Sequence, residues 1–488
     1  MCIRDRLSLS YTVAAAGSLL FAFLPYHLFR GEVHLLLSGI YIIPLASLAI
    51  LRVCAGTPPF IKLDEVGKAT YDFSSRRAFG YALISVLTAS AGIYYAIFAC
   101  FFLAVAGLYA AIDRKSLMRL AAAGIVIGLI IIGLIVNLSP NIINNHRYGK
   151  NPEVAGRLTI ETEILGTTST QLVLPATSHR VDFLANLKAE YMQGATLVNG
   201  SKAYVNENDW SSLGAIGSLG FLFLLAWLIF ARGRYGDDDS QFFTMLNGLG
   251  ILNITAILLA TIGGFGLLFS IVISSQIRAY NRISIYIGFF SIMAVLLLLE
   301  RWRQKYMKNG DRPMIFIGII MVVAAAGIVD QTNDTMVPDY MTIAKAYNSD
   351  QAFVQSIESQ MPAQAMVFQL PYAPFPENPP VNAMLDYNHL RAYLHSRTVH
   401  WSYGTMKGRN DDLWQRSVSS EPTDQFLKDI IAAGFNGIWI NRAGYADGAA
   451  QIERQLEDEL EVKPMLNDDN TLLFFNMKDY IDKLNSTR

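Results

Sequence analysis

The chain has 488 residues, of which 52% are hydrophobic and only 16% are charged, and its mean hydropathy is positive. Soluble proteins of this length rarely combine so many apolar residues with so few charges, so the composition indicates an integral membrane protein. The formal net charge of −1 leaves no large basic excess of the kind that nucleic-acid binding requires, and we expect no nucleic-acid partner.

Long apolar runs fill the chain up to about residue 330. Each run is close to the ~20 residues that cross a ~30 Å hydrocarbon core. We expect membrane spans near 9–26, 35–51, 79–112, 120–138, 212–231, 245–270, 284–300 and 313–330. As one helix the segment 79–112 would be about 50 Å long, too long for one crossing, and it contains the glycine-aromatic sequence AGIYYA. A broken pair of helices or a re-entrant hairpin is therefore expected there.

The N-terminus and the cysteines carry little structural information. The opening MCIRDR has no structural rationale and no signal-peptide pattern, so we expect true N-terminal spans to be missing. Cys2, Cys54 and Cys100 all lie in the apolar half. No disulfide framework or Cys-x-x-Cys metal site is therefore expected in the C-terminal half.

Basic residues define the expected orientation in the membrane. They flank the segment 79–112 on both sides, with Arg76 and Arg77 before it and an Arg-Lys pair at 114–115 after it. Cytoplasmic loops are enriched in Lys and Arg, so both flanks are predicted to be cytoplasmic. The other short basic loops agree with this choice. Residues 331–488 then lie outside the cytoplasm.

The first polar cluster on the outer side is a short link between two spans. The sequence LPYHLFRGEVHLLL brings Arg30, Glu32 and His34 together. Ionisable groups so close to hydrocarbon are costly unless they pair or face a cavity. They therefore form either an interfacial ion pair or part of a polar site.

The second cluster lies in the loop 139–211, which is too long to be only a connector. Its carboxylates include two pairs spaced two residues apart, Glu161 with Glu163 and Glu207 with Asp209. A carboxylate at an apolar boundary can gain basicity, so these four side chains are candidate catalytic residues. The alternative is a folded loop with ordinary surface charges.

Further cations near the membrane are candidates for holding a phosphate. His179 and Arg180 follow the apolar stretch TSTQLVLP in the same loop. Arg278 and Arg282 precede the span 284–300 and are four residues apart, hence on one face if the segment is helical. Guanidinium groups on the side with fewer basic loops oppose the positive-inside trend, and a phosphate or pyrophosphate is their natural partner. The alternative is ordinary flanking charge.

Beyond residue 331 the composition is that of a soluble domain with a small α/β fold. Strand patterns occur at the start of 365–380, in 436–445 and in 471–477, and helical patterns in 423–435 and 447–461. They predict a sheet of about three strands with helices packed on it.

Aromatic and basic residues are dense in one part of this domain. Candidates for contact with an acceptor are Tyr372, His389, Arg391, Trp401 and Tyr403. Such side chains suit sugar or phosphate contact, and equally docking onto the membrane domain. No Ser-His-Asp order, HExxH, Walker loop or GxGxxG pattern accompanies them.

The segments RGEVHLL, AGIYYA, GKNPEV with LPATSHR, RAYNRIS, and LPYAPFPENPP with WSYGTMKGR resemble those of bacterial membrane proteins of the GT-C glycosyltransferase superfamily. The resemblance covers most of the chain. It implies an inner-membrane enzyme that moves a sugar from a polyprenyl-phosphate donor to a lipid or surface-glycan acceptor, with its C-terminal domain outside. Its partners would be membrane lipids, the lipid-linked donor and the acceptor. A divalent metal ion is compatible with this class, although no ligand set is visible.

One feature departs from the GT-C pattern. Enzymes of that superfamily carry an acidic residue or pair in the first outer loop, where this chain offers only Glu32. Either the hallmark loop belongs to a missing N-terminus, which would then hold the base, or the protein is a non-catalytic relative of these enzymes.

We therefore expect a polytopic α-helical protein with a transmembrane domain (1–330) and an extracytoplasmic α/β domain (331–488) that acts as a GT-C-like glycosyltransferase. Catalysis would be an inverting displacement assisted by a carboxylate, with the donor phosphate held by Arg278 and Arg282. Two other functions stay open. A flippase for lipid-linked saccharides would carry charges in mid-membrane and repeat symmetry. A non-catalytic envelope assembly protein would need no pocket at these arginines.

Overall fold

The computed structural model describes residues 9–31, 33–63, 69–113, 115–154, 156–195, 205–231, 241–307 and 313–486. Of the residues singled out from the sequence, Cys2, Glu32 and Arg114 lie outside these ranges. The chain divides into two compact units. Unit 1 comprises residues 1–143 and 157–337, and unit 2 comprises residues 144–156 and 338–488.

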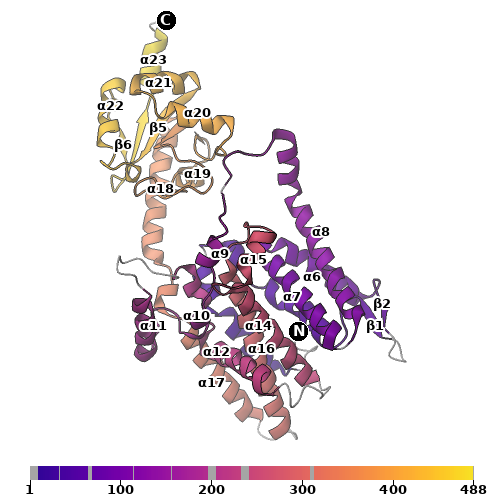
Figure 1. Ribbon diagram of the computed structural model, residues 1–488. Coiled ribbons are helices and arrows are strands. Elements are labelled where there is room, and N and C mark those ends of the chain that lie inside the picture. Colours follow the sequence, from indigo (N-terminus) through magenta and orange to yellow (C-terminus); the bar gives the residue numbers. More distant parts are fainter. Residues whose placement is uncertain are drawn as a thin grey trace. The chain divides into compact units, whose positions relative to one another are not determined.

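Unit 1 is built from apolar helices (Figure 1). Among the described residues, six helical segments are long and apolar enough to cross a membrane: Ile93–Asp113, Leu117–Tyr148, Gly214–Ala231, Gln241–Ala260, Tyr280–Tyr306 and Met314–Gln331. The first, second and fourth are the helices α7, α8 and α14, and the last lies within α17 (Pro313–Gln331). The third consists of α12 (Gly214–Ala226) and the π-helical η2 (Trp227–Ala231), and the fifth of η3 (Tyr280–Ile283) and α16 (Ser284–Tyr306). Shorter apolar helices are Tyr11–Ala22 (α2) and Ile42–Cys54 (α5). The chain therefore has the helices of a multi-pass membrane protein.

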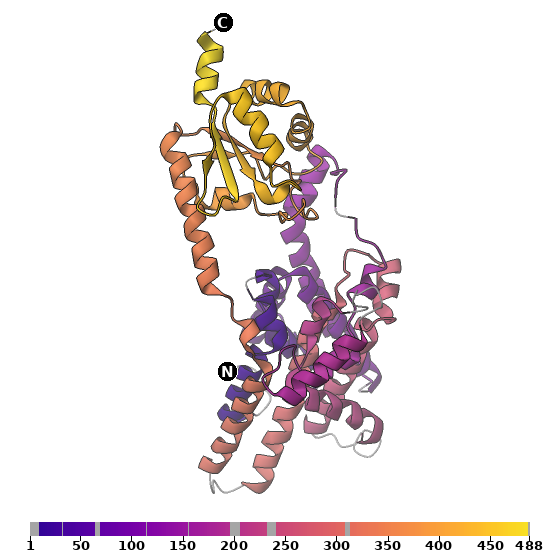
Figure 2. The same ribbon diagram turned by 90° about the vertical axis from the view of Figure 1, so that its left-hand side faces the viewer.

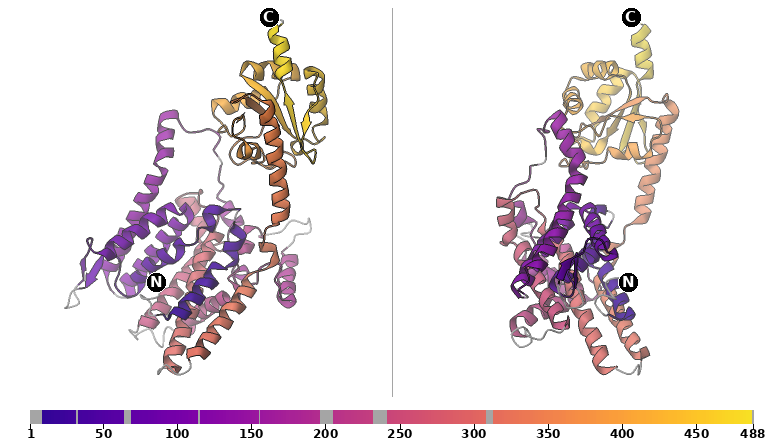
Figure 3. Two further views of the ribbon diagram at one scale, coloured as in Figure 1. Left: turned by 180° about the vertical axis from the view of Figure 1, so that it is seen from behind. Right: turned by 90° about the vertical axis from the view of Figure 1, so that its right-hand side faces the viewer.

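The helix α16 forms the centre of unit 1. About 83% of its apolar window is buried, compared with 22% for α8. It contacts α2, α5, α12 and α14, and α2 also lies beside α17 (Figure 3). The exposed apolar side of α8 is the kind of surface that a bilayer covers.

The long segment 79–112 is divided into two helices, as its length predicted. Helix α6 (Arg76–Ser90) ends just before Gly92, and α7 begins at Ile93. Gly92 has a φ of 141°, a value that residues with a Cβ rarely adopt. The two helices contact each other.

The expected span 245–270 is also interrupted, which the sequence did not indicate. Helix α14 ends at Ala260, and a separate short helix, α15, runs from Phe265 to Val272. Gly263 between them has a positive φ of 74°. The remaining elements of unit 1 are α3 (Pro25–Arg30), α4 (Leu35–Ser38), β1 (Ile61–Leu63), β2 (Ala69–Tyr71), α9 (Glu161–Ile164), α10 (Ser169–Val173), α11 (Asp182–Gly194), η1 (Glu207–Ser211) and η4 (Asp334–Met336).

Unit 2 contains a five-stranded mixed sheet in the order β4-β3-β5-β7-β6. Its strands are β3 (Met366–Leu370), β4 (His400–Trp401), β5 (Phe435–Asn441), β6 (Met465–Leu466) and β7 (Leu472–Asn476). Strand β3 is parallel to β4 and β5, whereas β7 is antiparallel to β5 and β6. The three strands expected from the sequence are β3, β5 and β7, and the two additional strands have only two residues each.

Helices cover both faces of this sheet (Figure 2). The elements are α18 (Tyr340–Gln360), α19 (Leu390–His395), α20 (Asn410–Val418), α21 (Thr423–Ala432), η5 (Arg442–Gly444), α22 (Ala450–Leu460) and α23 (Lys478–Ser486). Successive residues of β7 alternate between two cores. Phe474 packs with Phe353 and Val354 of α18, and Phe475 packs with the core of α21 and α22. The alternation follows from the two-residue period of a strand.

The segment 144–156 is fixed to the rest of unit 2 by polar contacts. Asn151 donates from Nδ2 to the Lys407 carbonyl at 2.7 Å, and Arg416 forms a bidentate pair with Glu153 at 3.0 and 2.8 Å. Unit 2 is therefore assembled from two separate stretches of the chain.

Candidate functional site

The loop between α8 and α12 is folded onto the helices of unit 1 through its backbone. Thr167 donates from its N–H to the Ala260 carbonyl at 2.9 Å and accepts from the Ile262 N–H at 3.1 Å. Asn281 donates from its N–H to the Leu165 carbonyl at 3.2 Å. These bonds occupy the groups that the end of α14 leaves free. The polar residues of the loop are thereby held against η3.

Two arginines, one fully buried and one half-buried, contact Glu207, the first residue of η1. Arg30, at the end of α3, is fully buried and donates from Nη1 to Glu207 Oε2 at 2.6 Å. Arg282 of η3 lies 3.5 Å from the other oxygen, Oε1, which also accepts from Asn281 Nδ2 at 3.2 Å. Three elements far apart in the chain thus meet at one carboxylate. We call Arg30, Glu207, Asn281 and Arg282 the arginine cluster.

Aromatic rings line the arginine cluster. The Arg30 guanidinium lies 4.6 Å from the ring centre of Trp210 and 5.4 Å from that of Tyr26. Arg282 lies 4.3 Å from the ring centre of Tyr94 on α7. Such stacking stabilises a partly desolvated cation without neutralising it.

The charges of the arginine cluster do not balance. Two guanidinium groups face one carboxylate. In the described part of the chain, Nε and Nη2 of Arg30 and Nε of Arg282 are buried and have no hydrogen-bond partner. A buried cation without enough partners is costly, and an anion is the group that would satisfy it.

The carboxyl group of Glu207 stays ionised in this setting. Burial by itself raises its pKa, but the hydrogen bond and charge of Arg30, together with Arg282 and Asn281, bring the pKa below its usual value. A carboxylate held by two arginines is a weak proton acceptor. Glu207 therefore serves better to hold the arginines than to take a proton.

A pocket of about 530 Å³ opens beside the arginine cluster. Its lining residues are Val33, His34, Leu35, Leu36, Leu37, Gly92, Ile93, Tyr94, Tyr95 and Arg282. One wall is apolar, with Leu35 and Leu36 largely exposed, and Arg282 provides a cation. Its volume is within the range of pockets that bind small ligands.

Arg278 does not join Arg282, contrary to their expected common helical face. Arg278 precedes η3, which begins only at Tyr280, and it pairs with Glu161 at 2.8 Å. Glu163 accepts a hydrogen bond from the Gly263 N–H at 2.6 Å, at the break between α14 and α15. The two glutamates of the first pair are thus engaged separately from the arginine cluster.

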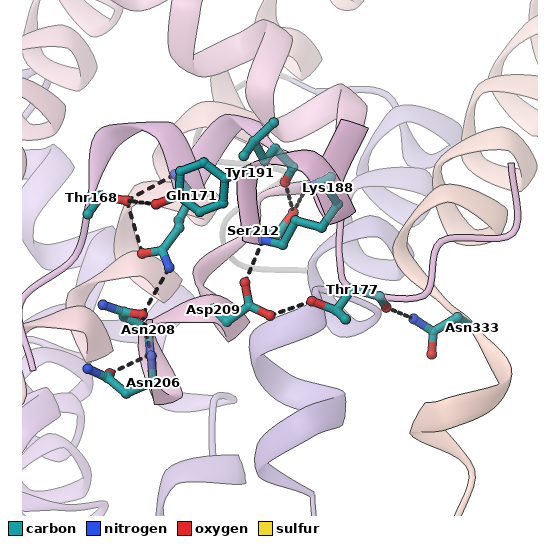
Figure 4. A network of polar contacts seen from close by, with 12 residues as sticks. Thr168, Gln171, Thr177, Lys188, Tyr191, Asn206, Asn208, Asp209, Ser212 and Asn333 are labelled. Atoms are coloured by element: carbon teal, nitrogen blue, oxygen red, sulfur yellow. Dashed lines mark hydrogen bonds and ion pairs between the residues drawn. The ribbon is translucent and has the colours of Figure 1, made fainter. Parts of the chain in front are cut away.

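Asp209 belongs to a second polar network (Figure 4). Its Oδ1 lies 2.5 Å from Nζ of Lys188, a fully buried residue of α11, and its Oδ2 accepts from Thr177 Oγ1 at 2.5 Å. Asn333 donates to the Thr177 carbonyl at 2.6 Å. No pattern in the sequence singles out Lys188, because α11 has the composition of an exposed helix.

His179 and Arg180 contact the end of the last span rather than the arginine cluster. The ring Nδ1 of His179 accepts from the Val181 N–H at 3.0 Å, so Nε2 carries the proton that bridges to Asp330 at 3.2 Å. Asp330 also accepts from the Ala215 N–H at 2.6 Å. Arg180 forms a 3.4 Å pair with the exposed Asp334.

The five residues predicted to contact an acceptor all have partners inside unit 2. Tyr372 donates to Asp412 at 2.6 Å, and Tyr403 donates to the Asp386 carbonyl. Arg391 forms a bidentate pair with Asp350 at 2.6 and 2.8 Å. These contacts build the loops around the sheet.

The other two of these five residues are also part of the fold. Trp401 packs against Trp439 with ring centres 5.4 Å apart. His389 is buried and bonds to the Pro371 carbonyl at 2.9 Å, and burial lowers its pKa to about 4. Each is therefore held by unit 2 itself.

Among the residues that the structure describes, no group of three or more His, Cys, Asp or Glu side chains is arranged to hold a metal ion. The chemistry that the arrangement offers is anion binding beside an apolar pocket. Three residues of these polar networks and of the pocket were not singled out from the sequence: Tyr94, Tyr95 and Lys188. Tyr94 and Tyr95 could have been found from the sequence, because they follow the glycine that breaks the segment 79–112. Comparison with protein-family models, with curated proteins and with solved structures found no match to this chain.

Proposed function

We propose that this chain is a bacterial inner-membrane glycosyltransferase that binds a polyprenyl-phosphate-linked sugar and transfers the sugar to a lipid or surface-glycan acceptor at the outer face. The observation that supports this function best is the arginine cluster at the wall of an apolar pocket of about 530 Å³.

The pocket combines the two surfaces that a lipid phosphate presents. Arg282 lines the pocket and supplies donors for phosphate oxygens, while Arg30 lies buried behind it on Glu207. A guanidinium group suits phosphate because its N–H groups form a planar fork. Leu35 and Leu36 supply an apolar wall for the first units of the lipid chain. In the transfer step the phosphate is the leaving group, and Arg282 stabilises the charge that it gains.

The position of the pocket along α7 supports the proposed sidedness. The pocket is at the start of α7, at Gly92–Tyr95, whereas α7 ends at Asp113, near the basic residue Arg119. Arg119 donates to the carbonyls of Val53 and Gly56 at the end of α5. The 21 residues of α7 cover about 30 Å, one hydrocarbon thickness. With the basic end in the cytoplasm, the pocket faces the opposite leaflet.

The test is sugar transfer by the full chain in lipid nanodiscs, with a panel of radiolabelled polyprenyl-phosphate sugars and a mixed lipid and glycan acceptor fraction. We expect Arg282→Ala to lower transfer at least 100-fold and Arg282→Lys to recover only part of it, because an ammonium group lacks the fork geometry. The matched control is Arg76→Ala, an exposed arginine at the start of α6, which should transfer at the wild-type rate.

The outcomes separate the three functions considered for the chain. Binding of the donor without transfer, and movement of the donor between leaflets, would favour a flippase. Absence of donor binding in the wild type would contradict the proposal and leave an assembly role. Sidedness has its own test: the exposed Ser359 of unit 2, replaced by cysteine, should react with a membrane-impermeant maleimide in intact spheroplasts. Labelling only after lysis would contradict the outer location.

A further inference from the structure

Sugar transfer needs a group that takes the proton from the attacking hydroxyl, and the candidate carboxylates are poorly placed for it. Glu207 is held by Arg30 and Arg282, Asp209 by Lys188, and Glu161 by Arg278. Glu163 is hydrogen-bonded to a backbone N–H. None of the four lines the pocket.

The pocket itself contains a different proton acceptor. Its lining residues that can exchange a proton are His34, Tyr94, Tyr95 and Arg282. An arginine stays protonated, and a tyrosine must first lose its own proton at high pH. Within the described part of the pocket, the His34 imidazole is thus the group that can accept a proton near neutral pH.

The surroundings of His34 keep the imidazole neutral. Partial burial lowers its pKa below 6.5, the charges of Arg30 and Arg282 lower it further, and Glu207 opposes them. Tyr94 and Tyr95 face the same pocket from α7. A neutral imidazole has a free lone pair on one ring nitrogen. The same arginines that attract a phosphate therefore also leave this nitrogen ready to accept a proton.

We propose that His34 is the general base of the transfer reaction, an inference that rests on the proposed function. The imidazole nitrogen takes the proton of the acceptor hydroxyl as the hydroxyl oxygen forms its bond to the anomeric carbon. The bond from that carbon to the phosphate oxygen breaks on the opposite face. The electron pair stays on the lipid phosphate, next to Arg282, and the proton leaves His34 for solvent after the product departs.

The first test is the pH profile of transfer by the full chain in nanodiscs. In the wild type the rate should fall on the acid side with a midpoint below 6.5, because the pKa of His34 is lowered. His34→Gln should lose roughly 10²- to 10⁴-fold in kcat, with the KM for donor within about twofold, and should lose this acid limb. Added imidazole should restore part of the rate of His34→Ala. His27→Gln, on α3 outside the pocket lining, is the matched control and should keep the wild-type profile.

A second measurement separates failure of this inference from failure of the proposed function. Diethylpyrocarbonate modification of His34, followed by mass spectrometry, should be slowed when a polyprenyl phosphate without sugar is bound. The role of His34 would be overturned, and the transferase left intact, by either of two results. In the first, the protein binds the donor and transfers the sugar, but the bound lipid does not protect His34. In the second, His34→Gln turns over at the full rate. Absence of both binding and transfer in the wild type would overturn the two together.

Discussion

The short helix η1 has two faces that look alike in sequence and differ in their charge. Glu207 and Asp209 are two residues apart, and each meets a buried cation from another element. On the Asp209 face one lysine meets one carboxylate, and a threonine occupies the second oxygen. On the Glu207 face two arginines share one carboxylate, and three of their nitrogens lack a partner among the described residues.

This difference distinguishes a structural ion pair from a binding site. The Lys188–Asp209 pair is balanced in charge, although its two atoms meet as an ion pair and make no hydrogen bond among the described residues. An excess of buried charge beside a pocket is stabilised further when an anion binds. The spacing of the two carboxylates in the sequence could not separate the two roles, because their cations come from α3, α11 and η3.

The largest effect should come from breaking the balanced face. Lys188→Met leaves the carboxylate of Asp209 largely buried without its cation, and we expect a loss of about 3–5 kcal/mol in unfolding free energy. Thermal unfolding in nanodiscs, followed by tryptophan fluorescence, measures it. Adding Asp209→Asn should restore part of the loss, and inorganic phosphate should restore none. A variant as stable as the wild type would show that the pair contributes little.

A smaller loss is expected on the unbalanced face. Glu207→Gln removes the charge shared by the two arginines but leaves their stacking on Trp210 and Tyr94, so about 1.5–3 kcal/mol is expected. Here millimolar phosphate should raise the unfolding temperature of the variant more than that of the wild type. Equal responses to phosphate in this variant and in Lys188→Met would remove the distinction between the two faces.

A substitution at Gly92 tests whether the backbone at the break between α6 and α7 shapes the pocket. A Cβ at this position would meet no atom within 4 Å, so Gly92→Ala adds strain only through its φ of 141°. We expect a loss of about 1–2 kcal/mol and weaker donor binding, because Ile93, Tyr94 and Tyr95 of the pocket lining follow this position. Ala91→Gly, one position earlier, is the control, since Ala91 is in the right-handed helical region. Unchanged binding in Gly92→Ala would show that the helix break does not shape the pocket.

The smallest effect expected is the change in the contribution of Glu207 to stability between pH 7 and pH 5. The folded-state pKa of Glu207 is lowered, so its contribution is present above its unfolded pKa and is lost as the pH falls through the folded value. The stability difference between the wild type and Glu207→Gln should therefore stay constant over this range and shrink only at lower pH. A difference that already shrinks at pH 6 would show that Glu207 is not held as an ion by the arginines.

Much of the fold could be predicted from the sequence. Helices that cross a lipid bilayer are long and apolar, and half-buried strands alternate apolar and polar residues, so both leave a pattern in the sequence. The break before α7 was predictable from the length of 79–112 and its glycine. The break at Gly263 was not, since distant residues, Glu163 and Thr167, fix it. Strands β4 and β6 were too short to show a pattern.

The candidate site was predictable only in its residue types. Arg282 and Glu207 were both singled out, but in different clusters and with Arg278 as the expected companion of Arg282. The actual companion, Arg30, lies more than 250 positions away in the chain. Such pairing depends on how α3 packs against η3, and a local sequence pattern cannot predict this packing. The same holds for Lys188, whose burial is decided by the loop that covers it.

The exposed leucines of the pocket wall have a consequence for kinetics. If the ligand is the proposed lipid-linked donor, it can enter past Leu35 and Leu36 by diffusing within the leaflet and need not cross water. Its effective concentration is then its mole fraction among the surrounding lipids. Diluting a fixed amount of donor with inert phospholipid should slow the protein even at constant bulk concentration, as in surface-dilution behaviour.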